Sequence, residues 1–249
     1  MCCFSRQVEF VSDTGIFARP GKQGRQLLAY GMKVGAPEDL AMILPIPVAA
    51  GTPEDGVSFI NLEGYPKLFD DLASGFEMKG EKFSLGVPAG RAAGTLKVET
   101  VGNFVASFVP TIGDFARLDA RFRLPDAVWK GLGQYAKFGF AVFQLKKGAG
   151  QIHPMAFSFP SATPEQLFFP TVHIHDGKVH AKAGFDHALY CQVAKGGLSS
   201  LMHWEESWKP ASAFVKTDKS RGLVEPERHV FRRGLKGMLA NEDMLLRVA

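Results

Sequence analysis

The sequence lacks most of the features that would place it in a specialised class of proteins. Its 249 residues contain no apolar run of the roughly 18 residues that a membrane helix needs, and the start has no basic segment followed by an apolar one, as a secretion signal would. No run of five like charges marks a nucleic-acid arm, and no glycine-rich phosphate-binding spacing occurs. We therefore expect a soluble, cytoplasmic protein that binds neither membranes nor nucleic acids.

Cysteine and tyrosine are scarce. The three cysteines are Cys2, Cys3 and Cys191, an odd count, and neighbours such as Cys2 and Cys3 bridge each other only with strain. We expect reduced thiols. Four tyrosines stand against 21 phenylalanines, which indicates aromatic side chains used mainly to fill a core.

The sequence does have several short segments with strand-like patterns, and its 46% hydrophobic content is enough for a full core. Short helices are predicted at 66–72 and 125–135. The fold class expected is α+β, with mainly antiparallel β-sheets, two or three short helices and a C-terminal arm. Strands are predicted at 26–34, 138–145, 154–159, 167–175 and 178–191.

The N-terminal region contains one turn signal and one apolar run that includes prolines. A hairpin is predicted with Asp13 to Gly15 as its loop, which would place Glu9 opposite Arg19. Further along, the apolar run 40–48 contains two prolines, and each removes a ladder donor. We expect an edge strand or an extended crossing there.

Residues 211–249 mix charged and apolar residues in a looser, partly helical pattern. Gly234 and Gly237 each weaken a long helix by about 1 kcal/mol relative to alanine, and the segment is too short to bury its own core. We expect one domain over 1–249, in which 211–249 is a C-terminal wrap or the arm of a homo-oligomer.

The most informative local pattern surrounds Asp176-Gly177, a dipeptide that favours a two-residue hairpin turn between alternating segments. This register would place His173, His175 and His180 on one face. Three imidazoles at that spacing could bind copper or zinc, with Cys2 or Cys3 completing the ligand shell. Lys178 and Lys182 would share the face and repel a cation, so an ordinary exposed face is the competing interpretation.

A family resemblance is carried by three short apolar segments. Residues 39–47 (Asp-Leu-Ala-Met-Ile-Leu-Pro-Ile-Pro), 138–145 and 155–160 resemble a family of uncharacterised bacterial proteins with a Leu-Pro-Val-Pro segment. The resemblance covers about half of the chain, and it implies a β-rich fold and no activity.

The N-terminus suggests a second kind of chemistry. Removal of Met1 would leave Cys2 with a free α-amine of pKa about 7.7 to 8.0, which can act as the base for its own thiol. A Cys2 start followed by Ile16-Phe17-Ala18-Arg19 is similar to the opening of bile-salt and penicillin-V amidases. Those enzymes have Asn and Asp just after the arginine, where this chain has Pro20, Gly21 and Lys22.

Three functions follow from these patterns. The leading expectation is a metal-binding protein, or a metalloenzyme, whose partner is a small molecule or a metal ion. The alternatives are an N-terminal-nucleophile amidohydrolase with Cys2 as the catalytic residue, and a non-catalytic binding or scaffold protein.

Overall fold

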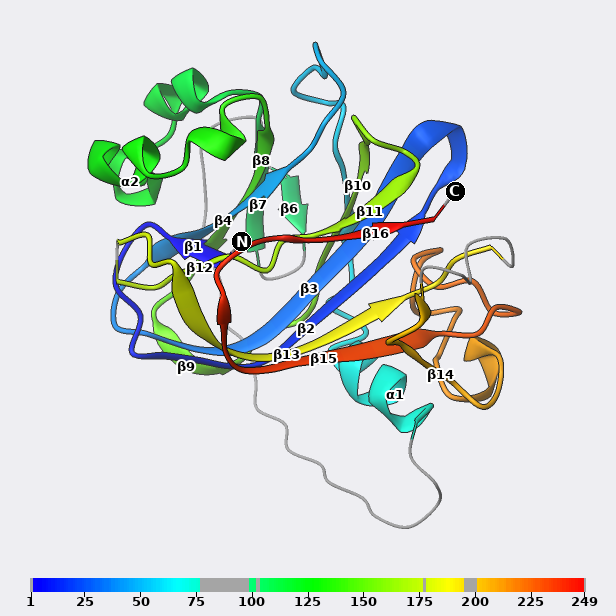
Figure 1. The fold of residues 1–249 in the computed structure, drawn as a ribbon. Helices are drawn as coiled ribbons and strands as arrows, with labels where there is room; N and C mark the ends of the chain where they lie inside the picture. The colour runs from blue at the N-terminus through cyan, green and yellow to red at the C-terminus, as the bar shows by residue number, and fades with distance from the viewer. Residues whose placement is uncertain (1, 77–98, 102–103, 177, 195–200, 249) are drawn as a thin grey trace.

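The computed structural model describes residues 2–76, 99–101, 104–176, 178–194 and 201–248. The predicted α+β class, mainly antiparallel β with a few short helices, is confirmed. Two large sheets pack against each other (Figure 1). Within the described residues, no helix combines the length and the apolar character that crossing a bilayer requires.

The smaller of these sheets has six strands. β1 pairs with β12 in parallel, and the other neighbours are antiparallel. Its strands, in spatial order, are β12 (His173–Ile174), β1 (Cys2–Phe4), β4 (Leu40–Ile46), β8 (Gly139–Leu145), β7 (Phe104–Val109) and β6 (Glu99–Val101).

Within the described residues the larger sheet has eight strands, and one parallel pair joins β13 to β2. A separate pair, β11 (Gln166–Phe169) and β16 (Met244–Arg247), is antiparallel. The larger sheet runs in the order β14 (Glu205–Glu206), β15 (Phe231–Ala240), β13 (Lys182–Cys191), β2 (Phe10–Pro20), β3 (Arg25–Ala36), β10 (Met155–Pro160) and β5 (Ser58–Asn61), with β9 (Gly148–Gln151) also on β3.

Both predicted helices are present and short. α1 (Leu68–Ser74) buries Leu68 and Leu72, as its apolar spacing predicts. α2 (Asp126–Lys130) begins after Pro125 and continues into a 3₁₀ turn. The 3₁₀ turns are η1 (Lys22–Gly24), η2 (Ile112–Arg117), η3 (Ala120–Phe122), η4 (Gly133–Tyr135) and η6 (Ala211–Ala213).

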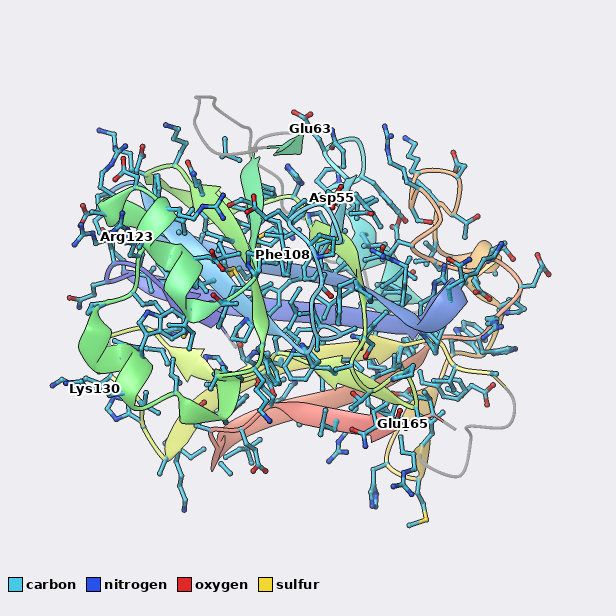
Figure 2. All side chains as sticks on the ribbon, turned by 90° about the horizontal axis from the view of Figure 1, so that it is seen from above. Asp55, Glu63, Phe108, Arg123, Lys130 and Glu165 are labelled. Atoms are coloured by element: carbon cyan, nitrogen blue, oxygen red, sulfur yellow. The ribbon has the colours of Figure 1, made fainter. Side chains whose placement is uncertain are left out.

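The main core fills the space between the two sheets. Leu28 and Phe157 of the larger sheet meet Met42 and Phe143 of the smaller one, and all four are fully buried. Side chains crowd this interior around Phe108, whereas Lys130 and other charged residues lie at the periphery (Figure 2). A second cluster lies under α2 and a third under α1.

The predicted N-terminal hairpin is wrong. Residues 10–20 form the single strand β2, which carries an irregularity between Ser12 and Gly15 where Asp13 has a φ of 52°. The turn-forming residues therefore make a bulge. Arg19 is paired with Glu225 at 2.8 Å and not with Glu9.

The prediction of an edge at 40–48 is also wrong, because β4 lies between β1 and β8. β1 pairs only with Met42 and Ile43, however, while β8 continues to Ile46. Pro45 thus lies beyond the last β1 partner, where its missing N–H removes no bond to that neighbour.

A row of small residues crosses four strands of the larger sheet on the face that carries α1. The row has one residue on each of β3, β2, β13 and β15, and each is the register partner of the next: Gly31, Gly15, Ala188 and Gly234. Phe69 of α1 lies over the first two, and a Cβ on Gly31 would come within 2.6 Å of its ring. Glycine at 15 and 31 therefore allows α1 to pack closely on the sheet.

Residues 211–249, expected as a wrap or an oligomer arm, contribute two strands. β15 pairs with β13 along its whole length, and β16 pairs with β11. Gly234 and Gly237, which disfavour a helix, lie inside β15.

Candidate functional site

A buried histidine cluster lies where the two sheets meet near the N-terminal strand. His173 comes from β12 and His187 from β13, and their ring centroids are 4.6 Å apart. His175 joins them, because its Nε2 lies 3.2 Å from Nδ1 of His173. Phe185 packs edge-on against His173 at 4.7 Å. The cluster is therefore a set of imidazoles enclosed by aromatic rings.

Burial controls the protonation of this cluster. It lowers the pKa of His173 to about 2, and the neighbouring His187 and His175 act in the same direction. Burial also lowers the pKa of His187 to about 3, and it lowers the pKa of His175. All three imidazoles are therefore neutral near pH 7.

The cluster contains polar atoms without a hydrogen-bond partner among the described residues. These are Nε2 of His173 and both ring nitrogens of His187. The carboxylate of Asp186 comes no closer to Nδ1 of His187 than 4.0 Å. Unpaired polar atoms in an apolar interior cost free energy of folding.

The structure places the predicted hairpin face differently. β12 contains only two residues and pairs with β1, and β13 begins at Lys182 and pairs with β15 and β2. His173 and His175 are together as predicted, but the exposed His180 instead contacts Asp176 at 2.9 Å. Gly177, the second predicted turn residue, lies outside the described residues. The three-histidine face is therefore wrong in its third member.

The two N-terminal cysteines lie in β1. The backbone of Cys2 is the register partner of His173, and that of Cys3 is the partner of Ile174. Since side chains alternate along a strand, Cys3 faces the cluster under α2, together with Ile174 and Ile43. Its buried thiol therefore points away from the histidines.

The copper or zinc site predicted from His173, His175, His180 and Cys3 is not formed by these side chains, and the side chain of Cys2, the fifth predicted ligand, lies outside the described ones. Across the described part of the chain, no group of three or more His, Cys, Asp or Glu residues could hold a metal ion. The physical reason is the register: it sends His180 to solvent and Cys3 to the opposite face.

The site predicted from the sequence did not include His187. The signal that could have found it is the alternation in β13, where Phe185, His187 and Leu189 are buried and Asp186 is exposed. The hairpin prediction assigned the neighbour of β12 to the wrong strand, so His187 was not placed beside His173.

An open groove of about 740 Å³ lies on the opposite face of the larger sheet, between α1 and β15. It is lined by four acidic and four basic side chains, and two of each are joined in salt bridges. Lys33 contacts Asp13 at 2.6 Å, and Arg232 contacts Glu205 at 2.7 Å. The bulge is held by Asp186, which accepts the N–H of Asp13 at 2.8 Å. The groove therefore offers no concentrated field to one kind of charged ligand.

Comparison with known proteins identifies a shared fold. No family model matches the chain, and no curated protein matches it. Among solved structures, it is similar to baculovirus P35, with a TM-score of 0.53, 12% identity and 97% of each chain covered. A mutated baculovirus P35 after caspase cleavage gives a TM-score of 0.54 at 13% identity, covering 96% of this chain and all of the other.

These findings overturn the metal-binding interpretation, whereas the amidohydrolase interpretation with Cys2 as nucleophile stays a prediction. The described residues hold no metal-binding group, and the whole-chain likeness is to P35 structures. At 12% and 13% identity, the likeness shows that the chain has the P35 fold.

Proposed function

We propose that this chain acts as a non-catalytic binding protein that engages a cysteine protease of the caspase kind. The observation that carries the proposal is the likeness to a P35 captured after caspase cleavage, which covers nearly the whole of both chains. Fold likeness is an analogy, so protease binding must be tested directly.

A caspase cleaves after aspartate, and the sequence restricts where such a cut could fall. No aspartate occurs between Asp71 and Asp114. Asp55, Asp176 and Asp218 are exposed and lie in turns or bends between the helices and strands, where proteolytic cuts concentrate. Asp55 is followed by Gly56 in the turn before β5, and it lies at the surface (Figure 2). We propose the Asp55–Gly56 bond as the first candidate.

The test combines inhibition with cleavage mapping. The purified chain is incubated with a panel of active caspases, and their hydrolysis of a fluorogenic aspartyl tetrapeptide is measured while intact mass reports fragments of the chain. The expected result is loss of activity of at least one protease together with a single internal cut. An uncut chain, with every protease fully active at a molar excess of the chain, would refute the proposal.

Matched variants locate the cut. Asp55→Glu keeps the charge but removes the cleavable residue, and Asp176→Glu and Asp218→Glu do the same at the other turns. The proposed site requires that only Asp55→Glu abolishes the cut. All three variants keep an exposed carboxylate, so none should change the folding of the chain.

A cytoplasmic location is part of the same proposal. Cys191 is free and buried, and such a thiol is typical of a reducing compartment.

A further inference from the structure

β15 presents the longest free strand edge in the described part of the chain. On one side it pairs with β13 over all its ten residues, whereas on the other side β14 covers only Phe231 and Arg232. Residues 233–240 thus have no described strand beside them, and β15 is outermost in Figure 1. The end strands β12, β6 and β5 have only two, three and four residues, the short length by which native sheets avoid further pairing.

The register shows which backbone groups face outward. The N–H of Asn241, one residue beyond β15, donates to the carbonyl of Ala181 at 3.0 Å. Hydrogen-bonded and non-hydrogen-bonded pairs alternate in an antiparallel ladder. The N–H and C=O groups that point away from β13 are therefore those of Gly234, Lys236, Met238 and Ala240. The same alternation directs Arg232 toward β14, where β14 pairs with it.

The side chains along this edge leave room for another strand. Gly234 and Gly237 have no atoms within 4 Å of where a Cβ would stand. Met238 is 68% exposed and Leu239 is 36% exposed, which is unusual for large apolar side chains. An added strand would cover this apolar surface and satisfy the outward backbone groups, as in recognition by strand addition.

The charge of the edge indicates the kind of partner. β15 contains three basic residues and no acidic one. Arg232 is paired with Glu205, but Arg233 and Lys236 have no salt-bridge partner among the described residues. Asp186 is the register partner of Lys236, yet it is engaged with the backbone of Asp13. A second copy of β15 would bring like charges together, which disfavours self-pairing.

We propose that the edge formed by residues 233–240 binds an extended acidic segment of a partner protein, which adds a strand to the larger sheet. Backbone hydrogen bonds to the outward groups give the affinity, and carboxylates near Arg233 and Lys236 give the preference for acidic partners. The site lies on β15 and does not depend on protease binding.

The test uses a fluorescein-labelled peptide of alternating valine and glutamate, blocked at both ends and as long as the free edge. Binding to the full chain is followed by fluorescence anisotropy, and a valine–lysine peptide serves as the control. Met238→Pro removes one outward donor and leaves the β13 ladder intact, because proline is tolerated where the N–H of an edge strand faces solvent. Met238→Ala is the matched variant that keeps the donor.

We expect saturable binding of the glutamate peptide and none of the lysine peptide. Met238→Pro should weaken binding up to about tenfold relative to Met238→Ala, the effect of one lost hydrogen bond. Lys236→Glu should weaken it as well, whereas Lys130→Glu on the distant α2 should not. Hydrogen exchange at the amides of Lys236 and Met238 should slow when the peptide binds.

Three outcomes would overturn the proposal. One is equal affinity for both peptides, and another is binding that Met238→Pro and Lys236→Glu leave unchanged. The third is a concentration-dependent dimer in light scattering that Met238→Pro abolishes, because that would assign the edge to a second copy of this chain. Lys236→Glu changes only an exposed side chain, so it keeps the test decisive even if Met238→Pro fails to fold.

Discussion

The buried histidine cluster predicts a loss of stability on mild acidification. The pKa values of His173 and His187 are about 2 and about 3 in the folded chain, against about 6.5 for a histidine in an unfolded chain. Above pH 6.5 neither state binds these protons, so the pair does not affect stability. Below that pH the unfolded chain takes up protons that the folded chain excludes, and stability falls until the folded pKa values are reached.

The size of the effect follows from the same values. At pH 5, each histidine with an unfolded pKa of about 6.5 favours the unfolded state by about 2 kcal/mol, and the pair by about 4 kcal/mol. This is a large part of the roughly 5 to 15 kcal/mol that stabilises a typical domain. Asp119, whose pKa is lowered to about 2 by Arg121, begins to lose its contribution only near its unfolded value of about 3.9. The window between pH 5 and 6.5 therefore lies above the range in which Asp119 titrates.

The assay is urea unfolding at several pH values between 5 and 8, for the wild type and for His187→Leu. The variant removes one titrating group and two unpaired ring nitrogens, so it should be at least as stable as the wild type at pH 8. Its pH dependence should be smaller by about 1.4 kcal/mol per pH unit. His203→Gln, at an exposed position, is the control. A wild-type midpoint that stays constant from pH 8 to 5 would refute the reasoning.

Three further predictions concern packing and buried hydrogen bonds, and thermal or urea unfolding checks each. Gly31→Ala should cost about 1 to 3 kcal/mol because its Cβ would clash with Phe69, whereas Gly234→Ala in the same row should be nearly neutral; equal losses would contradict the role of Phe69. Gln26→Leu should cost roughly 2 to 5 kcal/mol, since the Gln26 amide bonds both the N–H and the C=O of Phe168; unchanged stability would mean that another group replaces it. Tyr135→Phe should lower the free energy of unfolding by about 1.5 to 3 kcal/mol, because it removes the 2.5 Å hydrogen bond to Asp243. An ordinary hydrogen bond contributes about 0.5 to 1.5 kcal/mol, so a loss below about 0.5 kcal/mol would show that this bond adds little.

The sequence predicted elements well where local patterns decide the structure. β3, β8 and β10 appear close to their predicted ranges, and α1 buries the leucines that its spacing indicates. Each of these segments has an apolar pattern long enough to indicate its secondary structure without knowledge of its partners in the fold.

Strand partners could not be read from the sequence, and they decide the histidine site. Asp176 and Gly177 favour a local hairpin, but the register gives His173 a partner in β1 and brings His187 beside it from β13. The Asp13 to Gly15 segment likewise reads as a loop, although Phe69 packs on Gly15 and the strand continues through a bulge. In both places a long-range contact overrides a turn preference.

The parallel pairing of β2 with β13 has a consequence for the order in which the chain folds. The hydrogen bond that joins the backbone of Asp13 to the side chain of Asp186 spans 173 positions in the sequence. β1 likewise pairs with β12, which is synthesised much later. During synthesis the first strands leave the ribosome long before these neighbours exist, and contacts of such separation form slowly. The N-terminal strands therefore spend most of translation with one side unpaired, and the larger sheet is complete only after residue 240 has emerged.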